Sequence, residues 1–99
     1  MDKYDFNFKM KNLDETETEL LVSKELAQGL AMDTNSKNPL KSFLWAQSLF
    51  KDGIVEVDLA DKPLFEEIIK NLKFVPLLKA QILLVKPINK EVKDGSSTN

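Results

Sequence analysis

Apolar and polar residues alternate over the first ten positions of the chain. Single polar residues separate four apolar side chains: Tyr4, Phe6, Phe8 and Met10. A period of two places successive side chains on opposite faces of a strand, so this pattern predicts a half-buried strand. A shorter alternation over residues 54–59 predicts a second strand.

Two overlapping capping motifs predict that a helix follows the first strand. In each motif an oxygen-bearing side chain precedes a glutamate by three positions, as in a capping box. The pairs are Asp14 with Glu17 and Thr16 with Glu19. Apolar residues beyond these motifs recur at helical spacing, so we expect the helix to extend to about Met32, with Leu21 as an apolar residue outside its apolar face.

A second helix is predicted between Asn38 and Gly53. Asn38 is a suitable N-cap, Pro39 fits the first helical turn, and Gly53 supplies an ending. We expect the apolar arc of this helix to form much of the core through Phe43, Trp45, Ala46, Leu49 and Phe50.

Two more helices are predicted further along the chain. Asp61 and Pro63 mark the start of a third helix, whose apolar residues occupy one side of the helical wheel. The segment 77–85 follows Pro76 and is nearly all apolar, so its periodicity does not distinguish a helix from a strand. Its content of Leu, Lys, Ala and Gln favours a helix.

These elements predict a small α+β domain with the order β-α-α-β-α-α. The helices are expected to pack around a two-stranded antiparallel pair. A chain of 99 residues suffices for one hydrophobic core, so we predict a single globular domain over residues 1–88. Residues 89–99 are mostly polar and are expected to form a flexible tail.

The composition excludes several kinds of chemistry. The chain contains no cysteine and no histidine, which removes disulfides, thiol nucleophiles, Cys/His zinc sites and imidazole-based triads. Helix caps and solvated faces account for the carboxylates, and the oxygen-rich segment after Asp33 departs from the EF-hand pattern. We therefore expect no catalytic residues, no metal site and no cofactor.

Charge and hydropathy narrow the class of partner and the compartment. All 14 basic residues are lysines, and 16 carboxylates give a net charge of −2. The lack of guanidinium groups and the negative net charge both disfavour nucleic-acid binding. The pattern of a signal peptide and a run of about 18 apolar residues are both missing, so we expect a cytoplasmic protein with no membrane association.

Apolar residues in excess of what the core needs indicate a binding surface. The candidates are Leu21, Met32, Leu40, Leu44, Leu77 and Leu78. Spare apolar surface and unpaired strand edges favour self-association into a homo-oligomer or docking onto a protein partner. We therefore interpret the chain as a non-enzymatic interaction or assembly protein. Its arginine-free composition, rich in Lys and Asn, is typical of accessory proteins of bacteriophages and mobile elements, although no motif assigns it to a family.

Two other hypotheses stay open at this point. A small-molecule-binding module would need a cavity between the aromatic residues of the first strand and those of the second helix. An acidic inhibitor or regulator of a host protein would present the carboxylates of Asp14, Glu15, Glu17 and Glu19. That second hypothesis requires the carboxylates to be segregated in space from the lysines.

Overall fold

The computed structural model describes residues 1–88, and the tail predicted for 89–99 lies outside the described residues. The elements follow one another as β1 (Asp2–Asp5), β2 (Lys9–Lys11), β3 (Glu17–Leu21), α1 (Val22–Ala31), α2 (Pro39–Asp52), β4 (Ile54–Val57), the 3-10 helix η1 (Leu59–Asp61), α3 (Lys62–Asn71) and α4 (Pro76–Leu83). The fold is a small α+β fold, as predicted. It contains two antiparallel strand pairs, β1 with β4 and β2 with β3, in place of the single pair expected.

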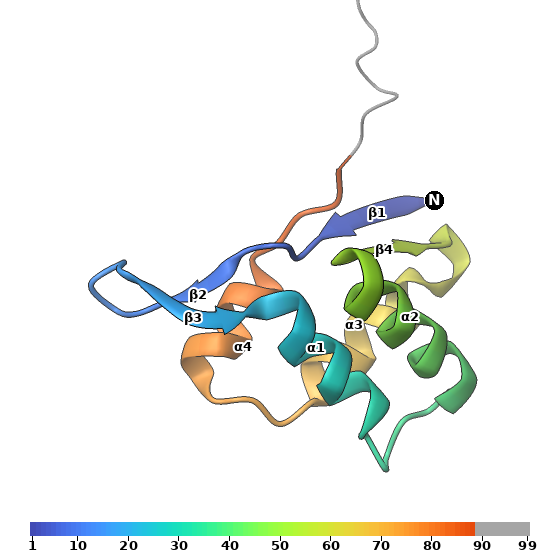
Figure 1. Ribbon diagram of the computed structural model, residues 1–99. Coiled ribbons are helices and arrows are strands. Elements are labelled where there is room, and N and C mark those ends of the chain that lie inside the picture. The colour runs from blue at the N-terminus through green and yellow to red at the C-terminus, as the bar shows by residue number, and fades with distance from the viewer. Residues whose placement is uncertain (89–99) are drawn as a thin grey trace, which may run out of the picture.

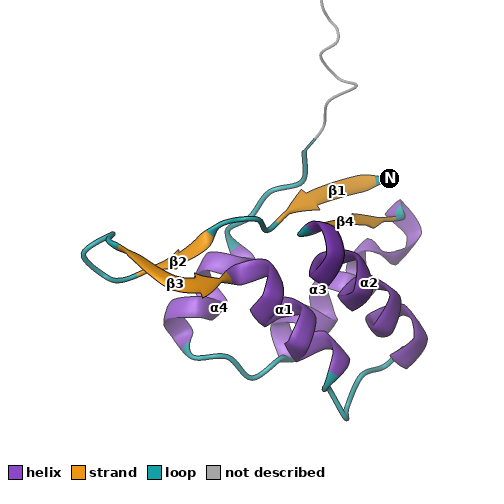
Figure 2. Ribbon diagram, viewed as in Figure 1, coloured by secondary structure: helices purple, strands orange, loops and turns teal. Residues whose placement is uncertain are grey.

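The helices enclose the core from two sides. Helices α1 and α2 lie next to each other on one side, and α3 and α4 lie on the other (Figure 1). The β1–β4 pair borders one end of this arrangement, and the β2–β3 hairpin lies beside α4, with its turn projecting beyond the helices (Figure 2). Among residues 1–88, no helix is both long and apolar enough to cross a membrane.

The predicted first strand is divided into two strands. Its alternation is confirmed, since Tyr4 and Phe6 are both buried, but the chain turns between β1 and β2. The backbone N–H of Asn7 donates to Oδ1 of Asp5 at 2.8 Å, and that of Phe8 donates to the carbonyl of Phe6 at 2.8 Å. This turn directs β1 toward β4 and β2 toward β3.

The predicted start of the first helix is wrong. Residues 12–16 form the turn of the β2–β3 hairpin, and α1 begins only after Leu21, the last residue of β3. Oδ1 of Asp14 accepts hydrogen bonds from the backbone N–H of Thr16 at 3.1 Å and from its hydroxyl at 2.7 Å, and Glu15 has a φ of 70°. Short oxygen-bearing side chains close turns as readily as they cap helices, so the motif alone did not separate the two outcomes.

Helix α2 begins and ends where the sequence predicts. Oδ1 of Asn38 accepts a backbone hydrogen bond from the first turn, and Gly53 takes the left-handed conformation with a φ of 73°. The prediction that Phe43 and Phe50 belong to the core is wrong, because both side chains are exposed. The helix contributes to the core through its other face.

The second half of the chain follows the sequence pattern more closely. The strand predicted over 54–59 ends early at Val57, and Leu59 lies exposed in η1. Helix α3 starts after Asp61, as predicted, but the carboxylate of Asp61 forms an ion pair with Lys41 and makes no capping hydrogen bond. The helix favoured after Pro76 is confirmed as α4.

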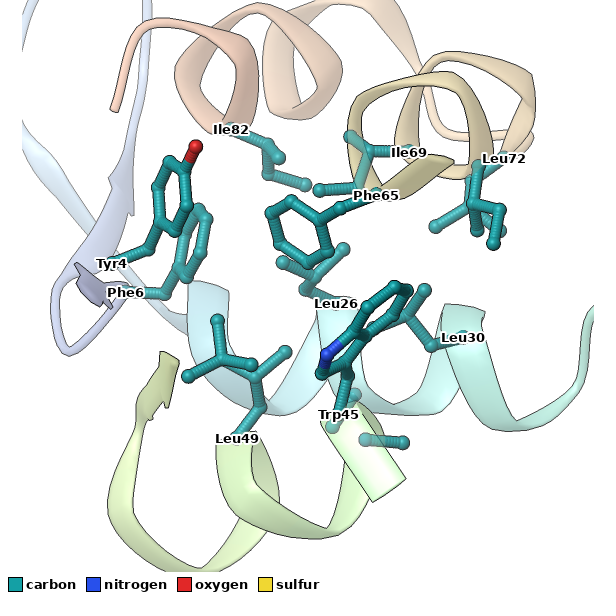
Figure 3. Close-up of a cluster of buried hydrophobic side chains, with 14 of the residues drawn as sticks. Tyr4, Phe6, Leu26, Leu30, Trp45, Leu49, Phe65, Ile69, Leu72 and Ile82 are labelled. Atoms are coloured by element: carbon teal, nitrogen blue, oxygen red, sulfur yellow. The ribbon is translucent and has the colours of Figure 1, made fainter. Parts of the chain in front are cut away.

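The buried side chains form a cluster between the two pairs of helices (Figure 3). Phe65 lies near its centre, with ring centroids 5.1 Å from Tyr4 and 5.0 Å from Trp45, the latter almost edge to face at 82°. Aliphatic side chains from the four helices and the end of α3 surround these rings: Leu26, Leu30, Leu49, Ile69, Leu72 and Ile82.

An ion pair between the partly exposed Lys62 and the buried Asp2 joins β1 to α3. Nζ of Lys62 donates to Oδ2 of Asp2 at 2.8 Å, and this hydrogen bond raises the pKa of Lys62. Burial raises the pKa of the neighbouring Tyr4, whose hydroxyl has no hydrogen-bond partner within residues 1–88. A buried, unpaired hydroxyl costs about 1–3 kcal/mol. This corner of the core therefore carries a stability cost and two groups with raised pKa values.

We predict that Tyr4→Phe raises the free energy of unfolding by about 1 kcal/mol at neutral pH, because it removes the unpaired hydroxyl. Both raised pKa values mean that the unfolded chain releases these protons at lower pH than the folded chain. The stability that these two groups contribute is therefore complete below about pH 10 and falls as the pH rises further. Urea unfolding at pH 7 and pH 10.5 should show a smaller alkaline loss for Tyr4→Phe than for the wild type. Equal losses would contradict the role given to Tyr4.

Candidate functional site

Helix α2 carries apolar residues well beyond its buried face. Its inner face is buried in the core through Trp45, Ala46 and Leu49. A second stripe, which we call the outer face of α2, is exposed despite its large apolar side chains: Leu40, Phe43, Leu44 and Phe50. Phe43 is 50% exposed and Phe50 is 60% exposed. Single exposed apolar residues are ordinary, but a contiguous stripe is typical of an interaction site.

A groove of about 500 Å³ runs between α1 and α2, beside this outer face. We call it the α1–α2 groove. Phe43 and Phe50 border it on the α2 side, and Met32 borders it just beyond the end of α1. Small side chains lie between these borders: Ala27, Ala31 and Ala46. The groove and the outer face of α2 share both phenylalanines and so form one continuous apolar surface.

The groove arises because α1 presents alanines where it faces the aromatic rings of α2. A methyl group is too short to cover a phenyl ring, so Phe43 and Phe50 stay accessible although α1 and α2 are packed together. At 100° per residue, these rings lie only about 60° and 40° around the helix from the buried Ala46. The helical wheel alone therefore assigned them to the core.

The charged residues that line the groove are both lysines, Lys24 and Lys51. Nζ of Lys24 donates to the backbone carbonyl of Phe50 at 3.2 Å and lies 3.9 Å from the centroid of the Phe50 ring. A cation over an aromatic face is stabilised by the ring quadrupole. Lys24 is thus fixed at the Phe50 end of the groove, and Lys51 is the next residue along α2.

The carboxylates near α2 lie toward β4, in a separate hollow of about 650 Å³. They are Asp52, Glu56, Asp58 and Asp61. Two lysines of this hollow are paired, Lys3 with Glu56 and Lys41 with Asp61. By contrast, Lys24 and Lys51 form no salt bridge with any residue in the described part of the chain. The groove is therefore a positively charged site on a protein of net negative charge.

The six leucine and methionine residues predicted as an interaction surface do not form one surface. Met32, Leu40 and Leu44 are exposed, as expected, but Met32 borders the α1–α2 groove whereas Leu44 lines the hollow toward β4. Leu21 and Leu77 are only half-buried and belong to β3 and α4. The placement of Leu78 on a surface is wrong, because its side chain is 5% exposed and packs in the core. Helix α4 thus contributes Leu78 and Ile82 to the core, while its Leu83 is exposed.

The most prominent residues of the surface, Phe43 and Phe50, were missed by the sequence prediction. A usable signal was present, because the apolar residues of α2 extend from Trp45 and Leu49 through both phenylalanines to Leu40 and Leu44, around more than half of the helix. A helix with such a wide apolar arc has more apolar surface than a single core contact can cover.

The acidic-regulator hypothesis gains no support from the hairpin. Its four carboxylates, Asp14, Glu15, Glu17 and Glu19, are exposed on the turn and on β3. Lysines lie across from them on β2, where Lys11 pairs in register with Glu17 and Lys9 forms a salt bridge with Glu19 at 3.7 Å. Hydrogen bonds from Thr16 lower the pKa of Asp14, as expected for a turn. Two of the four carboxylates therefore face lysines, so the four are not segregated from the basic residues.

The small-molecule hypothesis is weakened by the placement of its aromatic residues. Phe6 and Trp45 are packed in the core, whereas Phe50 is exposed in the α1–α2 groove, so no cavity forms between them. A hollow beside Tyr4 holds only about 160 Å³, below the roughly 300–1,000 Å³ of usual ligand pockets.

Neither a metal-binding cluster in the described part of the chain nor a similar protein indicates a function. Across residues 1–88, no three carboxylate, imidazole or thiol side chains gather closely enough to hold a metal ion. Comparison with known proteins finds no matching family model, curated protein or solved structure. The function is therefore argued from the surface itself.

We predict that Phe43→Ser lowers the free energy of unfolding by at most about 1.5 kcal/mol, because half of the ring is already in water. Full burial of a phenylalanine contributes about 1.5–3 kcal/mol. Urea unfolding followed by circular dichroism measures the difference. A loss as large as that of a core phenylalanine would show that Phe43 serves folding instead of binding.

Proposed function

We propose that this protein is a non-enzymatic interaction or assembly protein that binds a protein partner through the outer face of α2 and the α1–α2 groove. The observation that carries the proposal is the exposure of Phe43 and Phe50, which lie on the same helix and both border the α1–α2 groove. The cytoplasmic location and the accessory role in a bacteriophage or mobile element expected from the composition remain parts of this proposal.

The chemistry of the surface is that of a protein interface. Aromatic residues and methionine are enriched at the buried centres of interfaces, and a few such anchors supply most of the affinity. Phe43, Phe50 and Met32 are residues of this kind, and they border one groove. Polar groups at its edge, Gln28 and Gln47, can satisfy hydrogen bonds around the apolar centre.

Site-specific photocrosslinking tests the proposal in the cells that naturally make the protein. A benzophenone amino acid replaces Leu40 on the outer face of α2, where the side chain is 67% exposed. The matched control is Leu59 in η1, which is 66% exposed. We expect a discrete crosslinked protein band from position 40 and none from position 59. No band from position 40, or equal bands from both positions, would overturn the proposal.

A further inference from the structure

We infer that the occupant of the α1–α2 groove is an amphipathic α-helix of another protein, with carboxylates next to the apolar residues that enter the groove at its Phe50 end. This inference rests on the proposed function and adds the chemistry of the partner to it. It is carried by the dimensions of the groove, by the hydrogen bonding of its two helices and by the sign of its charges.

The spacing of the aromatic side chains suits a helix. Phe43 and Phe50 are seven residues apart on α2, which is two helical turns or about 10.5 Å. A helix that lies along this groove presents anchors at positions i, i+3 or i+4, and i+7 over the same length. The small side chains of Ala27, Ala31 and Ala46 leave room for such anchors between the two helices.

An extended peptide does not suit this site. Strand addition requires an edge with free backbone N–H and C=O groups. The groove lies between α1 and α2, and the interior backbone groups of a helix are already paired with one another. Of the main-chain groups near the Phe50 end, the carbonyl of Phe50 itself accepts a hydrogen bond from Lys24. The occupant must therefore bind through its side chains.

The charges favour an acidic occupant. Lys24 and Lys51 lie at one end of the groove, and no carboxylate lines it. A carboxylate on the occupant would pair with these ammonium groups, whereas a lysine there would be repelled. Complementary charges at the edge of an interface guide association and fix its register. Because both lysines lie near Phe50, the carboxylates are expected at one end of the bound helix only.

A second copy of this chain fits less well. In a two-fold symmetric pair, each copy presents the same surface to the other. If the groove of one copy faced the groove of the other, it would bring lysines and no carboxylate, so Lys24 and Lys51 would receive no partner from it. A different protein that supplies carboxylates satisfies the groove more completely.

A displayed library of amphipathic helices tests the inference. Each member is about 14 residues long, or about 21 Å as a helix, with varied apolar residues along one stripe and Glu, Gln or Lys at each flanking position. The full-length protein is the bait, and the Phe43→Ser/Phe50→Ser variant serves as the control bait. We expect helices to be enriched on the wild type alone, with Glu preferred near one end of the apolar stripe.

Charge reversal at the groove supplies the decisive comparison. For a selected Glu-bearing peptide, Lys51→Glu should weaken binding about fivefold, because a partly exposed ion pair is replaced by a repulsion. Selection on the Lys51→Glu bait should favour Lys where the wild type favours Glu. Lys70→Glu, on α3 and outside the groove, should leave the affinity unchanged. Matching thermal melts would show that the variants fold alike.

The other outcomes separate failure of the acidic-helix inference from failure of the proposed function. Enrichment without any charge preference overturns the inference about the acidic helix and leaves the proposed function standing. The same holds if no helix is enriched while position 40 still crosslinks to another protein, or if the crosslinked protein is a second copy of this chain. Failure of both the selection and the crosslinking overturns the inference together with the proposed function.

Discussion

Replacement of Phe65 by alanine should lower the free energy of unfolding by about 3–5 kcal/mol, the usual cost of removing a buried aromatic side chain. Phe65 is 1% exposed. Its ring lies between Tyr4 and Trp45, with centroid distances of 5.1 and 5.0 Å. The alanine would leave a cavity where strand β1 meets helices α2 and α3. The backbones of these three elements are held in place by other contacts. The lost packing is therefore not recovered by collapse.

Urea unfolding gives this free energy, and Phe43→Ala is the matched control. The control removes the same atoms from a side chain that is half exposed, so its effect should be several-fold smaller. If the two variants were destabilised equally, the division of the phenylalanines between the core and the binding surface would be wrong.

Replacement of Gly53 by alanine should cost about 2–4 kcal/mol, from backbone strain and steric overlap together. Gly53 has a φ of 73°, which an L-residue adopts at a cost of about 1–2 kcal/mol. Its position is fixed on both sides, because its N–H donates to the carbonyl of Leu49 at 2.8 Å and its carbonyl accepts from the N–H of Phe6 at 2.8 Å. A methyl group there would overlap the side chain of Asn7.

The two contributions can be separated by a double-mutant cycle with Asn7→Ala. Asn7 donates from Nδ2 to the carbonyl of Asp52 at 2.8 Å, so its removal has a cost of its own. In the Asn7→Ala background, Gly53→Ala should incur only the cost of backbone strain. The double variant should therefore be more stable than the sum of the two single effects predicts. Urea unfolding of the four proteins measures this. Additive effects would show that the overlap with Asn7 does not contribute.

The parts of the fold that the sequence predicted well are those in which local and long-range preferences agree. The end of α2 requires a residue in the left-handed backbone conformation, and glycine, as at Gly53, is best suited to it. In α3, Phe65, Ile68 and Ile69 fall on one side of the helix, and all three are buried. In such segments a single pattern has a single structural solution.

The hairpin was missed because its sequence supports two local structures. Asp14 followed by Thr16 can cap a helix or close a turn, and the structure selects the turn because β3 then pairs with β2. Further contacts hold this arrangement, since the side-chain amide of Gln81 both donates to and accepts from the backbone of Lys11 at 2.8 Å. Gln81 is 70 positions away from Lys11 along the chain, so no local pattern could reveal this choice.

The candidate surface could be predicted only in part for a related reason. The exposed positions of Met32, Leu40 and Leu44 followed from their misfit to the helical wheel. The exposure of Phe43 and Phe50 depended on which residues of α1 face them. That these residues are short alanines is visible in the sequence, but their position against α2 comes from tertiary packing.

The crosslink from position 40 in the Phe43→Ser/Phe50→Ser background tests most directly whether a protein partner binds at the outer face of α2 and the α1–α2 groove. The benzophenone stays on the outer face of α2 while both aromatic anchors of the groove are removed. We expect the crosslinked band to be lost while circular dichroism shows a folded protein. A band of undiminished intensity from the folded double variant would contradict this expectation.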